Sequence, residues 1–322
     1  MEFVKTLGKG EFGEVTLLKS IRTGELFVAK TVEGDSEKIK AGISRESKAL
    51  NRIKFKCEPY LLCLHNIQQP ERNKTVFLFK YLPGSYEMYE LIKTRMEFTP
   101  YTKYVIVERL MLGLLQLHRM GVVHRDIKPQ NVMLNPKMLT PVYIDFGLAC
   151  TSEETKCLRS LKGTPNYVAP EVLTSSNLAS FEQVKKSDVW SLGITILLFC
   201  TGKLPWEDHK MVRSLYQEIK MTTQGKMDYN LDEIAEEVKS GSFWVSLVRG
   251  MLNVDWRQRE SIEQALHHLY QGADNLMRSR GRQLGMSLEK ITEKARQEAT
   301  YFVVPKGTPI MGTTRNPLNK TI

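Results

Sequence analysis

Apolar residues near the N-terminus fall in short runs that are separated by turns containing glycine. Runs of this length and composition predict β-strands, and here the predicted strands are Phe3–Leu7, Val15–Leu18, Leu26–Thr31, Leu61–His65 and Val76–Tyr81. Between the third and fourth of them, residues 39–53 carry apolar side chains near one helical face and predict a helix. Pro83 and Gly84 then interrupt the pattern. The first eighty residues therefore predict a mostly antiparallel sheet with one helix.

Helical spacing predominates after this break. The predicted helices are Tyr104–Met120, Val189–Cys200, Phe243–Leu252 and Ile262–Tyr270. Val189–Cys200 is apolar on all sides, which is typical of a helix buried in the centre of its domain. The longest nearly unbroken apolar run, Leu192–Cys200, is far shorter than the ~20 residues that cross a bilayer, so we expect no membrane span. The whole pattern predicts an α+β fold.

Composition and charge exclude several classes of protein. The chain has 322 residues, of which 42% are hydrophobic and 25% charged, with a net charge of +10. These values exclude a disordered chain, a collagen-like fibre and a disulfide-rich miniprotein. A basic excess favours acidic partners, but a solvated cationic surface is the simpler interpretation. The first ten residues contain no apolar core of a secretory signal.

The last 52 residues form a polar, basic tail. From Gln271 onward there are nine basic and four acidic residues. Four apolar residues at helical spacing predict an amphipathic helix that docks onto the rest of the chain rather than a membrane. These residues are Leu284, Leu288, Ile291 and Ala295. The only aromatic residues of the tail are Tyr301 and Phe302, so a nucleic-acid partner is not expected.

The cysteines are Cys57, Cys63, Cys150, Cys157 and Cys200. Their number is odd and no pair has CxxC spacing, which favours reduced thiols and argues against a zinc site. This usage predicts a cytoplasmic or nuclear location. Cys150 and Cys157 lie close together in the sequence, and a regulatory disulfide between them is the alternative to two unrelated free thiols.

A glycine-rich segment, Gly8-Lys9-Gly10-Glu11-Phe12-Gly13, comes directly before the second predicted strand. Glycines at this spacing let backbone N–H groups approach phosphate oxygens that a side chain would keep away. A dinucleotide fingerprint would open a helix, whereas this segment joins two strands. An isolated match of this kind could also be a chance turn.

Four further segments follow in order. Lys30 ends the run Phe27–Lys30 on a predicted strand, and Glu46 lies 16 residues later on the predicted helix. A surface lysine and glutamate would be the ordinary interpretation of those two alone. The remaining segments are HRDIKPQN at residues 124–131, DFG at residues 145–147 and GTPNYVAPE at residues 163–171. Five segments in this order match the protein-kinase signature set, which makes chance an unlikely explanation.

Over residues 1–270 the sequence resembles the eukaryotic-type serine/threonine protein kinases. The resemblance implies a small β lobe at residues 1–80, a hinge at 81–84 and a larger helical lobe at 85–270, with ATP bound between the lobes. Residues 271–322 have no counterpart in the family pattern. Because the first predicted strand begins at Phe3, no regulatory region is expected before it, an economy that would suit a compact viral or microbial kinase.

The resemblance also assigns catalytic roles. Lys30 would hold the α and β phosphates, and Glu46 would orient Lys30. Asp126 would accept the proton of the substrate hydroxyl, and Lys128 would neutralise charge near the γ-phosphate. Asn131 and Asp145 would bind Mg²⁺, or alternatively Mn²⁺, through hard oxygen ligands.

By the same resemblance, Met133 would form the floor of the adenine pocket and Phe79 would occupy the gatekeeper position. Tyr81 and Leu82 would offer backbone hydrogen bonds to adenine. The family often has an acidic residue where Lys80 stands. The full set that the resemblance places around the nucleotide is Leu7, Gly8, Lys9, Gly10, Glu11, Phe12, Gly13, Val15, Ala29, Lys30, Phe79, Tyr81, Leu82 and Met133.

Substrate class and regulation follow from the activation segment, residues 145–171. Lys128 together with Thr164 is the serine/threonine pattern, and dual specificity is a minor alternative. Arg125 beside the catalytic aspartate is typical of kinases whose activation segment is ordered by phosphate. Thr155, Ser160 and Thr164 are the candidate regulatory hydroxyls, modified by an upstream kinase or by autophosphorylation. The partner is a protein substrate with a serine or threonine acceptor.

Other matches are structural. Asp188 resembles an aspartate that anchors the backbone of the catalytic loop, and Glu171 with Arg259 resembles a buried ion pair. Glu260 stands where the family usually has proline, so the start of the next helix differs. A stacked hydrophobic spine is expected from Leu50, Leu64, His124 and Phe146.

Two other functions compete with an active protein kinase. A pseudokinase would keep the fold and only scaffold partners, but no residue needed for transfer is missing. A kinase for small molecules or lipids would usually lack the GTP…APE segment, because such enzymes dock no extended peptide. The intact motifs favour an active protein kinase.

Overall fold

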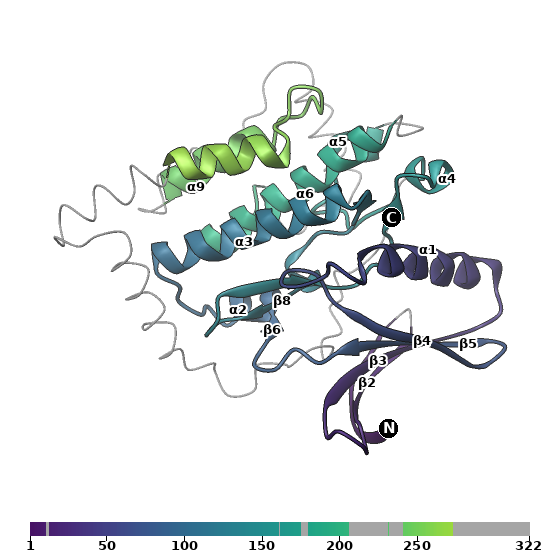
Figure 1. Cartoon of the computed structure of the whole chain (residues 1–322). Helices are drawn as coiled ribbons and strands as arrows, with labels where there is room; N and C mark the ends of the chain where they lie inside the picture. The colour runs from purple at the N-terminus through teal and green to yellow at the C-terminus, as the bar shows by residue number, and fades with distance from the viewer. Residues whose placement is uncertain (11–12, 161, 175–179, 206–230, 232–240, 273–322) are drawn as a thin grey trace.

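The computed structural model describes residues 1–10, 13–160, 162–174, 180–205, 231 and 241–272. These residues form a sheet-rich part followed by a helical part, and α1 lies on the face of the sheet that is turned toward the helices (Figure 1). The predicted α+β class is confirmed. Within the described residues, no helix is both long enough and apolar enough to span a membrane. The tail with its predicted amphipathic helix lies outside the described residues.

The sheet-rich part is a five-stranded antiparallel sheet in the order β1-β2-β3-β5-β4. Its strands are β1 (Glu2–Gly10), β2 (Gly13–Lys19), β3 (Leu26–Glu33), β4 (Leu64–Glu71) and β5 (Lys74–Lys80). Helix α1 (Glu37–Ile53) begins where the Ser36 hydroxyl accepts a hydrogen bond from the Ile39 amide, an N-cap that satisfies an otherwise unpaired donor. Its inner face buries Glu46, Ala49, Leu50 and Ile53.

The predicted strand Leu61–His65 is wrong in extent, because β4 begins only at Leu64 and continues to Glu71. β4 is an edge strand, and most of its residues are exposed, so the alternating pattern that identifies a half-buried strand is lost. Pro70 is tolerated there because an edge strand need not donate every amide hydrogen.

Residues 60–62 instead attach to the helical part. The Leu62 amide donates to the Tyr143 carbonyl at 2.9 Å, and the Tyr143 amide donates to the Tyr60 carbonyl at 2.8 Å. The Tyr143 hydroxyl donates to the Leu110 carbonyl at 2.8 Å. The segment before β4 is therefore bonded to the larger part of the molecule as well as to the sheet.

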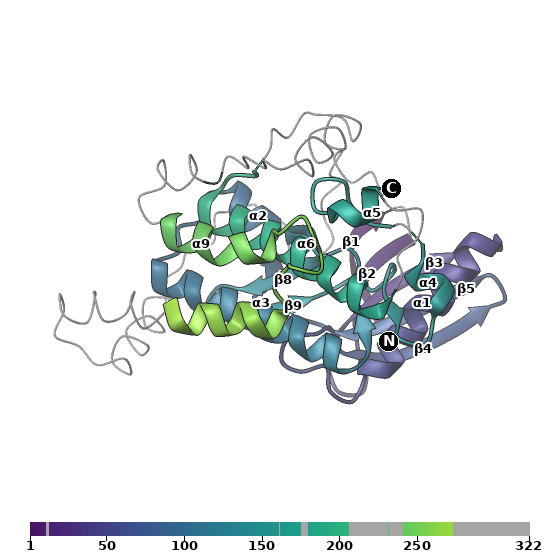
Figure 2. The same ribbon diagram turned by 90° about the horizontal axis from the view of Figure 1, so that it is seen from above.

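The helical part is built around two long helices in contact with each other, α3 (Pro100–Arg119) and α6 (Phe181–Thr201). Figures 1 and 2 show α9 (Gly241–Met251) packed along α6. Its described helices with printed bounds are α2 (Met88–Lys93), α3 (Pro100–Arg119), α4 (Thr155–Leu158), α5 (Pro170–Thr174), α6 (Phe181–Thr201) and α9 (Gly241–Met251). A further helix covers residues 262–272. Side chains of α6 are buried around its whole circumference between Val189 and Cys200, which confirms the prediction of a central helix.

Short strands connect these helices to the sheet-rich part. β6 (Tyr86–Glu87), β8 (Val132–Asn135) and β9 (Thr140–Tyr143) form a three-stranded sheet, and β7 (Val122–Val123) pairs with β10 (Cys150–Thr151). A single 3-10 turn, Pro129–Asn131, precedes β8. None of these short elements has enough residues to produce a recognisable periodicity in the sequence.

The helix at 262–272 starts without the proline common in the family. The Gln264 amide donates to the Ser261 hydroxyl at 3.3 Å, and the Ser261 amide donates to the Gln264 side-chain oxygen at 2.7 Å. This reciprocal pair is a capping box, which satisfies two amide hydrogens that a helix start leaves unpaired. It fixes the start of the helix beside Glu260.

The expectation of reduced thiols is wrong for four of the five cysteines. The structure pairs Cys57 with Cys63 and Cys150 with Cys157 as disulfides, with Cα atoms 5.3 and 6.0 Å apart. Cys200 is free and buried. The spacing in the sequence does not reveal these pairs, because the turn after α1 and the short helix α4 bring the partners together in three dimensions.

Candidate active site

The ammonium group of Lys30 lies between two carboxylates from different parts of the chain. Lys30, on β3, contacts the Glu46 carboxylate on α1 at 2.7 Å and the Asp145 carboxylate at 2.8 Å. Val15 and Phe77 flank Lys30 on the neighbouring strands β2 and β5. The structure thus brings together three predicted site residues that are up to 115 positions apart.

The charges of these three groups are coupled. Burial by itself would raise the pKa of Asp145, but the attraction of the Lys30 ammonium lowers that pKa to about 2. Burial raises the pKa of Glu46, and Lys30 only partly opposes this effect. Burial alone would lower the pKa of Lys30, but the two carboxylates raise it. Asp145 is therefore ionised and Lys30 protonated at neutral pH.

The pKa of Asp145 predicts how acid affects stability. The group ionises more readily in the folded chain than at its ordinary pKa of 3.8, so its contribution to the free energy of unfolding is present above about pH 4 and lost as the pH falls toward 2. We expect the stability difference between wild type and Asp145→Asn to shrink over that range in urea unfolding curves. A stability difference between the two proteins that is constant from pH 6 to pH 3 would contradict a lowered pKa for Asp145.

The second cluster surrounds Asp126. Its carboxylate accepts a hydrogen bond from the Thr164 hydroxyl at 2.6 Å and from the Asn131 side-chain amide at 2.8 Å, and it lies 2.8 Å from the Lys128 ammonium. Lys128 also donates to the Thr164 hydroxyl at 2.7 Å. Lys128, Asn131 and Thr164 are buried, whereas Asp126 is half-buried. The Asp126 carboxylate, whose side chain is 10% exposed, is thereby held in one orientation by three donors.

Asp188, on α6, fixes the backbone of this loop. Its carboxylate accepts hydrogen bonds from the amides of His124 at 2.9 Å and Arg125 at 2.8 Å. Arg125 has a φ of 68°, a conformation that costs a non-glycine residue of order 1 kcal/mol or more. The two bonds stabilise that conformation, which confirms the predicted anchoring. Sequence reasoning missed the third partner of Asp188, the His118 ring at 3.0 Å.

The predicted hydrophobic spine residues are all buried. The His124 and Phe146 rings pack with their centroids 5.1 Å apart, and the His124 ring bonds to the Ile144 carbonyl at 3.0 Å. This packing fixes the segment that carries Asp145 against the loop that carries Asp126. The residues of the predicted spine are Leu50, Leu64, His124 and Phe146.

The described glycines lie on the paired ends of β1 and β2, as the position of the segment between two predicted strands suggests. Gly8 pairs with Val15 and Gly10 with Gly13. Glu11 and Phe12 lie outside the described residues. Gly13 has a φ of 128°, and a Cβ atom there would lie 1.7 Å from the Thr31 carbonyl oxygen. Only glycine lets the start of β2 approach the carbonyl of Thr31, the residue after Lys30, this closely.

The described residues predicted for the adenine pocket come from both parts of the molecule, from the five-stranded sheet and from β8. Leu7, Ala29, Phe79 and Met133 are buried, and Val15 is partly buried. Lys9 is exposed and lies 3.3 Å from Glu14.

The predicted hinge has a hydrogen bond of its own. The Tyr81 amide donates to the Leu26 carbonyl at 3.3 Å. Adenine would therefore have to use other backbone groups of the predicted hinge, such as those of Leu82.

The candidate regulatory hydroxyls differ in their surroundings. Thr155 is exposed at the start of α4. The Ser160 hydroxyl lies 3.0 Å from the guanidinium of Arg125. Thr164 is buried and bonded to Asp126 and Lys128, a contact that no spacing in the sequence signals.

Comparison with known proteins decides the family. Residues 1–271 match the protein kinase domain. The chain belongs to the protein kinase family. It is 28% identical over 266 residues to the probable serine/threonine-protein kinase fhkC of Dictyostelium discoideum, a match that covers 82% of this chain and 43% of that protein.

Two further similar kinases come from a plant and from the same amoeba. CBL-interacting protein kinase 21 of Oryza sativa subsp. japonica is 31% identical over 224 residues, which cover 68% of this chain and 41% of that protein. A probable myosin light chain kinase of Dictyostelium discoideum is 26% identical over 268 residues, which cover 83% and 82%. The chain spans less than half the length of the first two of these kinases.

Proposed function

We propose that the protein is an ATP-dependent serine/threonine protein kinase that transfers the γ-phosphoryl group to serine or threonine hydroxyls of a protein substrate. The observation that carries the proposal is the position of Lys30, in contact with both Glu46 and Asp145 while Asp126 is held separately by three donors. Phosphoryl transfer requires positioned charge more than covalent chemistry, and this arrangement supplies it.

Each group has a role that fits its surroundings. Lys30, protonated and held by two carboxylates, binds the α and β phosphates. Asp126 accepts the proton of the substrate hydroxyl, since its side chain keeps 10% of its surface exposed and three donors fix its orientation. Lys128 lies next to that carboxylate and neutralises charge on the phosphoryl group in transit.

Asp145 and Asn131 fit a divalent cation. Asp145 is ionised and about a third exposed. The Asn131 side chain donates from its amide nitrogen to Asp126, so its oxygen faces away from that carboxylate. A carboxylate and an amide oxygen are hard ligands that suit Mg²⁺, with Mn²⁺ as the alternative. When bound, the metal supplies positive charge next to the phosphates.

Thr164 and Lys128 support the serine/threonine assignment. Both touch Asp126, so the segment that would dock a substrate peptide is bonded directly to the proposed base. We propose that Thr164 positions Asp126 from this buried place.

Ser160 is the hydroxyl best placed for regulation. A phosphate there would carry about two negative charges next to the Arg125 guanidinium, now 3.0 Å from the hydroxyl, and the activation segment would gain charge-assisted hydrogen bonds. We propose that an upstream kinase or autophosphorylation supplies this phosphate, with exposed Thr155 as the second candidate.

Because the reaction consumes ATP, we place the protein in the cytoplasm or nucleus.

The test is transfer of labelled phosphate. The purified full chain is incubated with γ-labelled ATP and Mg²⁺, with a basic protein, an acidic protein or no added substrate. We expect label on serine and threonine in wild type and none with Asp145→Asn. Failure of wild type to bind ATP with Mg²⁺ and to label any acceptor, even after treatment with an upstream kinase, would overturn the proposal.

A further inference from the structure

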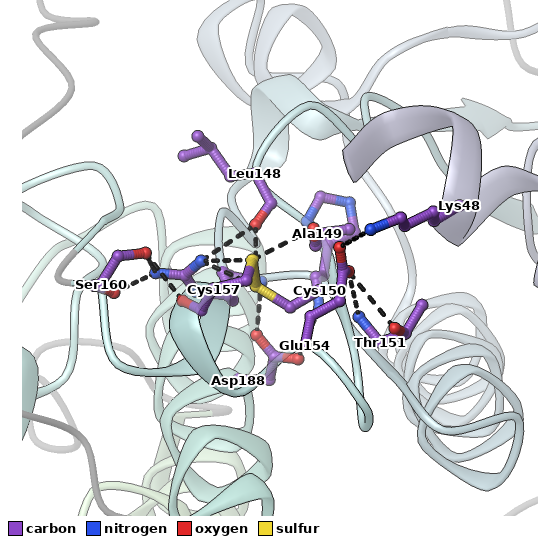
Figure 3. The surroundings of a disulfide bond; sticks show 11 residues. Lys48, Leu148, Ala149, Cys150, Thr151, Glu154, Cys157, Ser160 and Asp188 are labelled. Atoms are coloured by element: carbon purple, nitrogen blue, oxygen red, sulfur yellow. Dashed lines mark hydrogen bonds and ion pairs between the residues drawn. A yellow bond between two sulfur atoms is a disulfide. The ribbon is translucent and has the colours of Figure 1, made fainter. Parts of the chain in front are cut away.

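The Cys150–Cys157 disulfide joins β10 to α4 and closes a short loop within the activation segment (Figure 3). Two acidic residues of this loop contact α1. Glu154 lies 2.9 Å from Lys48, and Glu153 lies 2.7 Å from Arg52. Glu154 also accepts hydrogen bonds from the backbone and hydroxyl of Thr151, so the closed loop presents its carboxylates in a fixed geometry.

The disulfide also touches the arginine next to the proposed base. Arg125 Nη1 lies 2.9 Å from the Sγ atom of Cys150 and 3.4 Å from that of Cys157, and Nη2 lies 3.0 Å from the Ser160 hydroxyl. Burial lowers the pKa of Arg125 to about 10, although Asp188 partly opposes this effect. Because Asp188 offsets only part of the cost of burying this positive charge, an anion that forms beside the Arg125 guanidinium is stabilised.

We propose that Cys150 and Cys157 form a redox modification site that takes a small-molecule thiol–disulfide couple as its reagent. The disulfide form holds the activation segment against α1 and favours phosphoryl transfer, and the dithiol form releases this contact. The effect on catalysis rests on the proposed kinase function, whereas the thiol chemistry and the release of α1 do not.

The exchange balances with two equivalents of thiol. A thiolate attacks Cys157 Sγ, because Cys157 is slightly exposed while Cys150 is completely buried. The S–S bond breaks, a mixed disulfide forms on Cys157, and Cys150 leaves as a thiolate beside the Arg125 guanidinium. A second thiolate attacks the sulfur that the reagent added, releases the Cys157 thiolate and forms the reagent disulfide. The reverse sequence, with the reagent disulfide as oxidant, restores the bond.

Reduction acts on catalysis through two contacts. The open loop no longer fixes Glu153 and Glu154 against α1, and α1 carries Glu46, which holds Lys30. The Cys150 thiolate pairs with Arg125, which then has less capacity to bind a phosphate on Ser160. Disulfides in reducing compartments are typically transient and redox-sensing, which agrees with this use.

The test compares the oxidised and reduced full chain by hydrogen exchange and by kinase activity. After treatment with a dithiol reductant, we expect faster amide exchange in residues 148–160 and 37–53 and a decrease in kcat/KM of about 5-fold or more. The pair Cys150→Ser with Cys157→Ser, which has neither the disulfide nor a thiolate, is expected to show the fast exchange of the reduced protein under both conditions and no response to the reductant. Cys150→Ala with Cys157→Ala repeats the measurement if the serine pair fails to fold.

The second disulfide supplies the matched control. Cys57→Ser with Cys63→Ser removes a bond of similar span that has no contact with Arg125 among the described interactions, so this variant should still respond to the reductant. Unchanged exchange in both segments on reduction, or a response that follows Cys57 and Cys63, would overturn the proposal. A change in exchange without any kinase activity would instead contradict the proposed function alone.

Discussion

Asp126→Asn is expected to lower kcat by about 10²–10⁴-fold while ATP affinity stays unchanged. The substitution keeps the shape of the side chain but replaces an acceptor oxygen with an amide that cannot take a proton. The Thr164 hydroxyl and the Asn131 amide hold the carboxylate in place at 2.6 and 2.8 Å. Both groups are donors, so neither can take over as the proton acceptor when Asp126 is replaced. Steady-state transfer to a protein substrate, with ATP binding measured separately, checks the result.

A surface aspartate gives the matched control for this prediction. Asp35 is mostly exposed and pairs with Lys40 at 3.3 Å, so Asp35→Asn should leave kcat unchanged. Should Asp126→Asn retain more than about a tenth of the wild-type kcat, Asp126 would not be the base.

Arg259→Met is expected to destabilise the fold by about 3–5 kcal/mol. Arg259 is completely buried and forms two hydrogen bonds of 2.8 Å to the Glu171 carboxylate, while its guanidinium stacks over the Trp190 ring at 5.0 Å. Without the arginine, the Glu171 carboxylate stays buried with no cation beside it. For a domain of this size the loss corresponds to a Tm lower by on the order of 10 °C.

Two further variants separate the ion pair from general damage. Adding Glu171→Met to Arg259→Met removes both charges, so the double variant should be more stable than Arg259→Met alone. Glu58→Gln breaks the exposed Lys80–Glu58 pair of 2.8 Å and should change the unfolding free energy by less than about 1 kcal/mol. Equal Tm losses for Glu58→Gln and Arg259→Met would argue against burial as the cause.

Much of the site was predictable from the sequence, because its chemistry requires particular residue types at short, fixed spacings. The position of Lys30 on a strand and Glu46 on a helix followed from local periodicity, and their 2.7 Å contact agrees with that placement. The anchoring of the loop by Asp188 was expected from the resemblance to the kinase family, and the structure places this residue within α6, where it is buried.

Other features depend on contacts between distant segments and left no local signal. The Cys150–Cys157 pair forms because the short helix α4 turns the chain back toward β10. Thr164 meets Asp126 only because the activation segment folds over the catalytic loop. β4 was misplaced because an exposed edge strand lacks the alternating burial from which a strand is recognised.

The bonds between Tyr143 and residues 60–62 have a consequence for motion. The chain already crosses from the sheet-rich part to the helical part near residues 81–84, and these bonds of 2.8 and 2.9 Å add a second attachment. A body held at two separate points can rotate only about the line through them, and the ion pairs from α1 to Glu153 and Glu154 add a further, breakable restraint. Where those ion pairs are broken, we expect the two parts to swing about this one axis rather than to move apart freely.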